Sequence, residues 1–131
     1  MKSRQEIHNS RPISPHLTIY KKQISSVLSI FHRLTGAGLF FGFAIVMWWF
    51  SLLIFSRFDS FYIELGGGCL VRGCLVLISF SGFYHFCTGI RHLVWDTGRW
   101  FSIKAVNVSG WIAVICSIIF TAVFWVYIYQ L

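Results

Sequence analysis

The sequence predicts an all-α integral membrane protein with three transmembrane helices. Of its 131 residues, 56% are hydrophobic and only 11% are charged, and the mean hydropathy is +0.71. Soluble domains carry about a quarter charged residues, so a surface with so little charge must face lipid. Three apolar blocks, 34–55, 73–90 and 105–131, are close to or above the roughly 20 residues that cross a bilayer as a helix. Each block must be helical, because a helix pairs every backbone polar group within its own segment and the blocks lack the alternating pattern of barrel strands.

The first 24 residues form a polar arm that we expect to lie at the membrane interface. Pro12 and Pro15 disfavour helix at the residues that precede them. The arm has neither the apolar core of a signal peptide nor the Arg-rich amphipathic pattern of an organelle transit peptide. These features favour the inner (cytoplasmic) membrane of a bacterium, or the mitochondrial inner membrane if the chain is organelle-encoded.

After the arm, we expect one membrane-anchor domain whose three helices comprise residues 25–56, 66–94 and 106–130. Trp48 and Trp49, near the far end of the first helix, are typical interfacial anchors. Residues 58–65 are expected to form a short external loop. Residues 95–104 are expected to turn back along the cytoplasmic face and to lead into the third helix.

The net charge of +7 does not indicate nucleic-acid binding, because the charges sort by side of the membrane. Basic residues dominate the arm and the start of the first helix: Lys2, Arg4, Arg11, Lys21, Lys22 and Arg33 against Glu6. They also dominate the stretch after the second block, which has Arg91, Arg99 and Lys104 against Asp96, whereas the first loop has Arg57 against Asp59 and Glu64. Since basic residues mark the cytoplasmic side, the N-terminus and the second loop are expected there, and the first loop and the C-terminus outside.

His85 is the ionisable residue that stands deepest in an apolar block. Such a group costs roughly 3 kcal/mol or more in lipid, so it usually faces a cavity or a partner. At helical spacing it shares one stripe with Gly82, Gly89 and His92. The two glycines remove side chains that would hold a flat macrocycle away from the helix, which favours haem ligation by His85. The alternative is that the glycines serve helix packing and that His85 makes a hydrogen bond to another helix.

A low-spin haem generally requires a second strong axial ligand. The other histidines of the chain are His8, His16, His32 and His92. His32 is near the start of the first helix, and His92 follows His85 on the same helix, so neither easily faces His85 across a porphyrin. The second ligand is therefore expected from another chain.

A small polar face at the cytoplasmic end of the first helix is the second candidate site. Ser25, Ser29, Arg33 and Gly36 repeat there at helical spacing. A quinone head group offers two carbonyl acceptors, and its reduction develops negative charge on those oxygens. A hydroxyl donor with a permanently charged guanidinium suits that chemistry. The alternative is that Arg33 extends to phosphate head groups and that Ser29 bonds back to its own helix.

Three motifs together carry a resemblance to a known family. They are R-P-I-S-P-H-L-T-I-Y at 11–20, S-I-F-H-R-L-T-G at 29–36 and H-F-C-T-G-I-R-H-L-V-W-D at 85–96. In this order and spacing, the chain resembles the cytochrome b membrane-anchor subunits of succinate dehydrogenase (complex II), of the mitochondrial and alphaproteobacterial type. Lys22 is a departure, because many relatives have proline there, and it affects only the expected conformation of the arm.

The resemblance implies a role for each matching residue. His85 matches the axial histidine that binds the iron of haem b. Ser29 and Arg33 match residues that line the ubiquinone pocket. His32 and Arg33 match groups near the haem propionates. We expect His92 to be a cofactor-binding residue as well. The family's partners are a flavoprotein subunit, an iron–sulfur subunit and a second small membrane anchor, which shares the haem by supplying its other axial histidine.

The function implied is a membrane anchor that helps form the site where electrons from the iron–sulfur subunit reduce ubiquinone, within the tricarboxylic acid cycle and the respiratory chain. The chain is not expected to be catalytic alone, because succinate oxidation needs a flavin and charged residues that it lacks. The competing interpretation is a purely structural anchor without redox groups.

Overall fold

The computed structural model describes residues 3–10, 22–55, 60, 64 and 67–130. The arm motif at 11–20 and most of the expected external loop at 58–65 lie outside these ranges. Within these ranges the regular secondary structure is helical, with α1 at Arg4–Asn9, α2 at Ile24–Phe55, α4 at Cys69–Asp96 and α5 at Ile103–Gln130. The last three are long and apolar enough to cross a membrane, which confirms the all-α fold with three transmembrane helices.

Local capping explains where the helices begin and end. Ser3 and Glu6 form a reciprocal capping box at α1, with bonds of 2.8 and 3.2 Å to each other's backbone N–H. The helix α4 continues two residues beyond the expected 94, until Gly98, at a φ of 76°, reverses the chain and donates to the Trp95 carbonyl. The helix α5 begins three residues before the expected 106, because the Ser102 hydroxyl accepts the Ala105 N–H at 3.3 Å.

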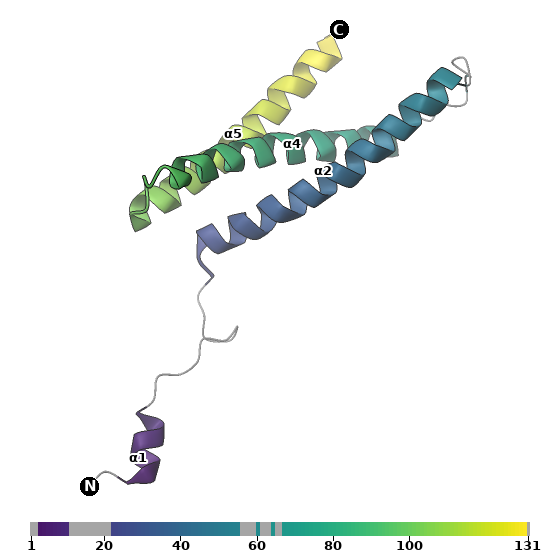
Figure 1. Ribbon diagram of the computed structural model, residues 1–131. Helices are drawn as coiled ribbons and strands as arrows, with labels where there is room; N and C mark the ends of the chain where they lie inside the picture. The colour runs from purple at the N-terminus through teal and green to yellow at the C-terminus, as the bar shows by residue number, and fades with distance from the viewer. Residues whose placement is uncertain (1–2, 11–21, 56–59, 61–63, 65–66, 131) are drawn as a thin grey trace.

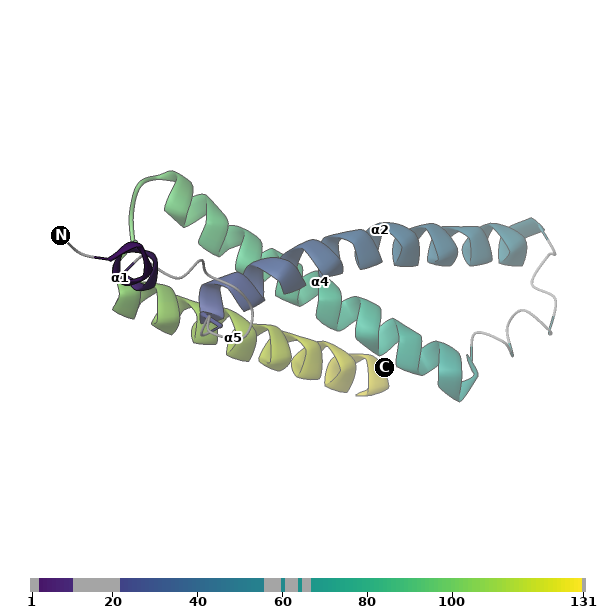
Figure 2. The ribbon, with the colours of Figure 1, turned by 90° about the horizontal axis from the view of Figure 1, so that it is seen from below.

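The three long helices run alternately up and down, and α4 packs against both of the others (Figure 1). The start of α2 meets α5 at Gly110, where a Cβ atom would lie 2.8 Å from the Leu28 side chain. From this contact α2 and α5 diverge toward their far ends, as both views show (Figures 1 and 2). The start of α2, the end of α4 and the start of α5 therefore lie together at one end of the bundle.

Small residues form the interface between α4 and α5. On α5 the buried positions repeat every four residues, at Ser109, Ala113, Ser117 and Thr121. Small side chains at this spacing let two membrane helices approach closely without the hydrophobic driving force that water supplies. Large apolar side chains such as Phe40 and Trp48 are instead exposed, by 71% and 67%, as expected of a surface that faces lipid or another chain.

Candidate functional site

The His85 ring is oriented by helix α2. Its Nδ1 atom lies 3.1 Å from the backbone carbonyl oxygen of His32. A carbonyl oxygen only accepts, so Nδ1 carries the hydrogen and donates it. The neutral ring then holds its lone pair on Nε2, which is the nitrogen left for an acceptor role or a metal. Metal-binding histidines are usually held in this way, with the other ring nitrogen donating to a carbonyl or carboxylate.

His32 packs flat against His85. The two ring centroids are 3.9 Å apart, and the rings are within 8° of parallel. The His32 Nδ1 atom lies 2.7 Å from the hydroxyl oxygen of Thr88, and that hydroxyl donates in turn to the Tyr84 carbonyl at 2.7 Å. Because the one proton of the hydroxyl is used there, His32 Nδ1–H is the donor to Thr88. Thr88 itself is only 1% exposed.

His92 completes a cluster of three histidines. Its ring lies 5.0 Å from His32 and packs edge-on against Trp95 at 5.3 Å. The sequence motifs are far apart in the chain, and the packing of α2 on α4 brings these side chains together. Among the described residues no group of three or more His, Cys, Asp or Glu side chains could hold a metal ion. The cluster therefore does not form a multidentate metal centre.

The donor set fits one axial ligand to a haem and not two. His85 presents a lone pair on Nε2, as a haem-binding imidazole requires. The stacked contact of 3.9 Å leaves no room for a macrocycle between His85 and His32. His92 lies on the same helix as His85. The described part of this chain thus offers His85 no opposing histidine.

The glycines near His85 lie at the contact with α2. A Cβ at Gly82 would be 3.8 Å from Leu39, and one at Gly89 would be 3.9 Å from His32. This differs in part from the expected bare surface for a macrocycle, because an α2 side chain comes within van der Waals contact of each position. Helix packing by the glycines and an interhelical hydrogen bond from His85 are thus both present in the structure. Neither uses the Nε2 lone pair.

Ser29 and Arg33 keep their polar groups free of partners within the described part of the chain. Ser29 is half-buried and Arg33 is exposed. Neither side chain makes a hydrogen bond or ion pair with another described residue. The alternative in which Ser29 bonds back to its own helix is therefore not what the structure contains. Both groups remain available to donate to a ligand or another chain.

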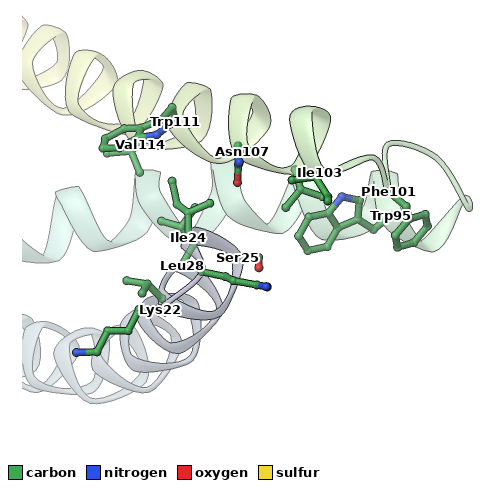
Figure 3. A pocket seen from close by; sticks show the side chains of 13 residues that line it. Lys22, Ile24, Ser25, Leu28, Trp95, Phe101, Ile103, Asn107, Trp111 and Val114 are labelled. Atoms are coloured by element: carbon green, nitrogen blue, oxygen red, sulfur yellow. The ribbon is translucent and has the colours of Figure 1, made fainter. Parts of the chain in front are cut away.

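A cavity of about 850 Å³ lies close to these residues, where the start of α2, the end of α4 and the start of α5 meet (Figure 3). Ser25 lines it, whereas Ser29 and Arg33 do not. The side chains around it are mostly apolar and aromatic: Lys22, Gln23, Ile24, Ser25, Val27, Leu28, Trp95, Phe101, Ile103, Val106, Asn107, Trp111 and Val114. The residues of the small polar face expected on α2 therefore have different surroundings. Ser25 lines this cavity, Arg33 is exposed, and Gly36 contacts His85.

Arg91 is a residue whose place the sequence did not reveal. It lies within the expected second helix, among the basic residues that follow the apolar block, but its side chain is buried and only 5% exposed. Its Nε atom donates to the Ser109 hydroxyl at 3.1 Å, and Nη2 donates to the Val106 carbonyl at 3.0 Å. Its guanidinium also stacks 4.0 Å above the Trp95 ring. Arg91 therefore joins the end of α4 to the start of α5.

Tyr84 and Thr88 were not singled out from the sequence, although their spacing in it contains a signal for their role. The Tyr84 hydroxyl donates to the Leu28 carbonyl of α2 at 3.2 Å. Tyr84, Thr88, Arg91 and Trp95 follow one another at intervals of four, three and four residues. Polar groups at this spacing within a membrane helix share one face, and that pattern could have marked them as interhelical contacts.

Comparison with known proteins covers nearly the whole chain. The family model described as the succinate dehydrogenase/fumarate reductase transmembrane subunit matches residues 8–124. The succinate dehydrogenase cytochrome b556 subunit of Rickettsia bellii is 60% identical over 126 residues, which cover 95% of this chain and 98% of the relative. The cytochrome b560 subunit of Reclinomonas americana is 40% identical over 124 residues, covering 89% and 85%. The resemblance seen in the three motifs is thereby confirmed.

Proposed function

The chain belongs to the succinate dehydrogenase/fumarate reductase transmembrane subunit family, and from this premise we propose that it is a haem b-binding anchor of a succinate:quinone oxidoreductase. In this proposal His85 Nε2 would hold the haem iron. The observation that carries the assignment is the hydrogen bond from His85 Nδ1 to the His32 carbonyl. It fixes the tautomer that leaves the Nε2 lone pair free, which is the usual arrangement of a metal-binding histidine.

A second small membrane anchor would supply the other ligand in this proposal, so that the two chains would share the haem. The contact between His32 and His85 and the position of His92 on the same helix as His85 support this. A bound haem b supplies one-electron redox chemistry at this depth of the membrane. The residues of this chain would help to hold the haem, and His32, Arg33 and His92 would lie near its propionates.

Ser29 and Arg33 are proposed to contribute to a ubiquinone-reduction site. The Ser29 hydroxyl donates to a quinone carbonyl oxygen, and the Arg33 guanidinium stabilises negative charge as it develops there. Their freedom from other partners in the described structure supports this role. Electrons would reach the quinone from the iron–sulfur subunit. That subunit would receive them from the flavoprotein subunit, which oxidises succinate. The three apolar helices hold that assembly at a bacterial inner membrane or a mitochondrial inner membrane.

A reduced-minus-oxidised absorption spectrum of the purified complex tests the proposal. Dithionite should produce the sharp α band of a low-spin b-type haem, in an amount that matches the content of this subunit. A correctly assembled complex with no such band would favour the purely structural anchor instead.

A further inference from the structure

The His85 ring is enclosed by α2 on three sides. Its Nδ1–H is bonded to the His32 carbonyl, one face lies on the His32 ring, and its edge lies against the backbone of Gly36. We propose that Gly36 and Thr88 are positioning residues that together set the orientation of this ring. The inference rests on the proposed function, because it assumes that the ring so positioned is the haem ligand.

Gly36 sets the distance between the ring and α2. A Cβ atom at this position would lie 2.9 Å from His85 Cε1 and 3.4 Å from Nδ1. The first distance is shorter than carbon atoms tolerate, so a methyl group here must displace the ring. The ring cannot move freely in response, because the His32 ring lies flat against it. Displacement would therefore lengthen the hydrogen bond from Nδ1, which already measures 3.1 Å.

Thr88 acts through His32. Its hydroxyl accepts the His32 Nδ1–H at 2.7 Å while donating to the Tyr84 carbonyl, so it fixes both the rotation of the His32 ring and its tautomer. The ring thus fixed forms the wall against which His85 rests. Without the hydroxyl, His32 Nδ1–H loses its partner in a half-buried site, and the ring is free to leave the stack.

The orientation of an axial histidine and its outer hydrogen bond tune the redox potential of a haem. The bond to the His32 carbonyl makes the imidazole a stronger donor, which favours the oxidised iron. Loosening that bond should weaken this preference. The midpoint potential of the haem should therefore rise when either positioning residue is altered, even though His85 remains in place.

The test compares matched variants in the whole purified complex, with potentiometric titration of the haem and its low-spin EPR signal as readouts. Gly36→Ala is paired with Gly38→Ala, because a Cβ at Gly38 would meet nothing within 4 Å. Thr88→Val is paired with Thr121→Val, since Thr121 is 9% exposed and makes the same type of bond, to the Ser117 carbonyl of its own helix at 2.7 Å. Thr88→Ser, which keeps the hydroxyl, should restore the wild-type values.

Gly36→Ala and Thr88→Val should raise the midpoint potential and shift the EPR g values, whereas both control variants should match the wild type. Wild-type values in an assembled Gly36→Ala or Thr88→Val complex would overturn the proposal for that residue. If Thr88→Val does not assemble, Thr88→Cys replaces it, because a thiol is a much weaker hydrogen-bonding group, and the same shift is required. A wild-type complex without a low-spin b-type haem would instead refute the proposed function itself.

Discussion

The directions of two hydrogen bonds determine which nitrogen carries the hydrogen in the His85 and His32 rings. The His32 carbonyl can only accept, so the His85 ring must donate from Nδ1 and keep its lone pair on Nε2. The Thr88 hydroxyl has one proton, which goes to the Tyr84 carbonyl, so His32 must donate as well. These two bonds assign the tautomers of both rings without any appeal to the family.

Ser29 and Arg33 lead to a prediction at the same scale. If the Ser29 hydroxyl donates to a quinone carbonyl as proposed, Ser29→Ala removes one hydrogen bond worth on the order of 1 kcal/mol, so ubiquinone reduction should fall severalfold to about tenfold. Arg33→Leu should reduce it further, because a fixed positive charge is lost where negative charge develops. Arg33→Lys should rescue only in part, since an ammonium lacks the planar donor geometry of a guanidinium. Steady-state reduction of ubiquinone by succinate in the purified complex is the measurement.

Two controls accompany these variants. Succinate oxidation by a dye that accepts electrons from the soluble subunits should stay near normal in all of them. Ser26→Ala changes an exposed serine on another face of α2 and should leave quinone reduction unaltered. Full ubiquinone reduction by assembled Ser29→Ala and Arg33→Leu complexes would show that the quinone binds elsewhere.

The helices α4 and α5 are joined by small residues and by one buried cation. Arg91 has no acidic partner among the described residues, and its charge is met by a hydroxyl, a carbonyl and the Trp95 ring. A buried guanidinium that loses one of these partners is left with an unsatisfied donor, which costs more than an ordinary lost hydrogen bond.

Ser109→Ala should therefore destabilise the assembled protein by about 1.5–3 kcal/mol, the range for a hydrogen bond to a charged group. Ser117→Ala is the matched control, because Ser117 is fully buried on the same helix and its hydroxyl bonds only to the Val114 carbonyl of that helix. Thermal unfolding in detergent should show a lower midpoint for Ser109→Ala than for Ser117→Ala. Equal midpoints would mean that the bond between Arg91 and Ser109 contributes little to holding α4 and α5 together.

The number and type of the helices could be predicted from the sequence, because length and hydropathy are properties of each segment alone. The contact between His32 and His85 could not, since it depends on how α2 is rotated against α4, and that rotation is set by close approaches such as Gly36 on His85. The burial of Arg91 could not be predicted for a similar reason. A charge near the end of an expected membrane helix is consistent with an exposed position until the neighbouring helix supplies its partners. The roles of Ser29, Arg33, His32, His85 and His92 stay predictions.

The whole molecule is an open bundle whose apolar surface needs other molecules. No residue in the most apolar part of α2 is buried within this chain, and α2 diverges from α5 toward its far end (Figure 2). Lipid or another membrane subunit must therefore cover that surface. The charge pattern predicts how the bundle is oriented in the membrane, although Arg72, exposed in the first turns of α4, is a basic residue at the opposite end.

That orientation is tested by single-cysteine labelling from outside the cell membrane with an impermeant maleimide. Cys69, exposed at the start of α4, should react when the other native cysteines are replaced by alanine. In a chain without native cysteines, Ser102→Cys, in the turn between α4 and α5, should react only after the membrane is opened. The reverse pattern would show that the basic residues do not mark the cytoplasmic side here.

Binding of the haem iron by His85 is tested most directly by the absorption and EPR spectra of the purified complex carrying His85→Leu, beside one carrying His92→Leu. Leucine cannot ligate iron, and the other described histidines near this site, His32 and His92, occupy different positions. His85→Leu should therefore abolish the low-spin spectrum with two axial histidines, whereas His92→Leu should keep that ligation and alter at most the affinity or potential of the haem. An unchanged low-spin spectrum in His85→Leu would contradict the assignment.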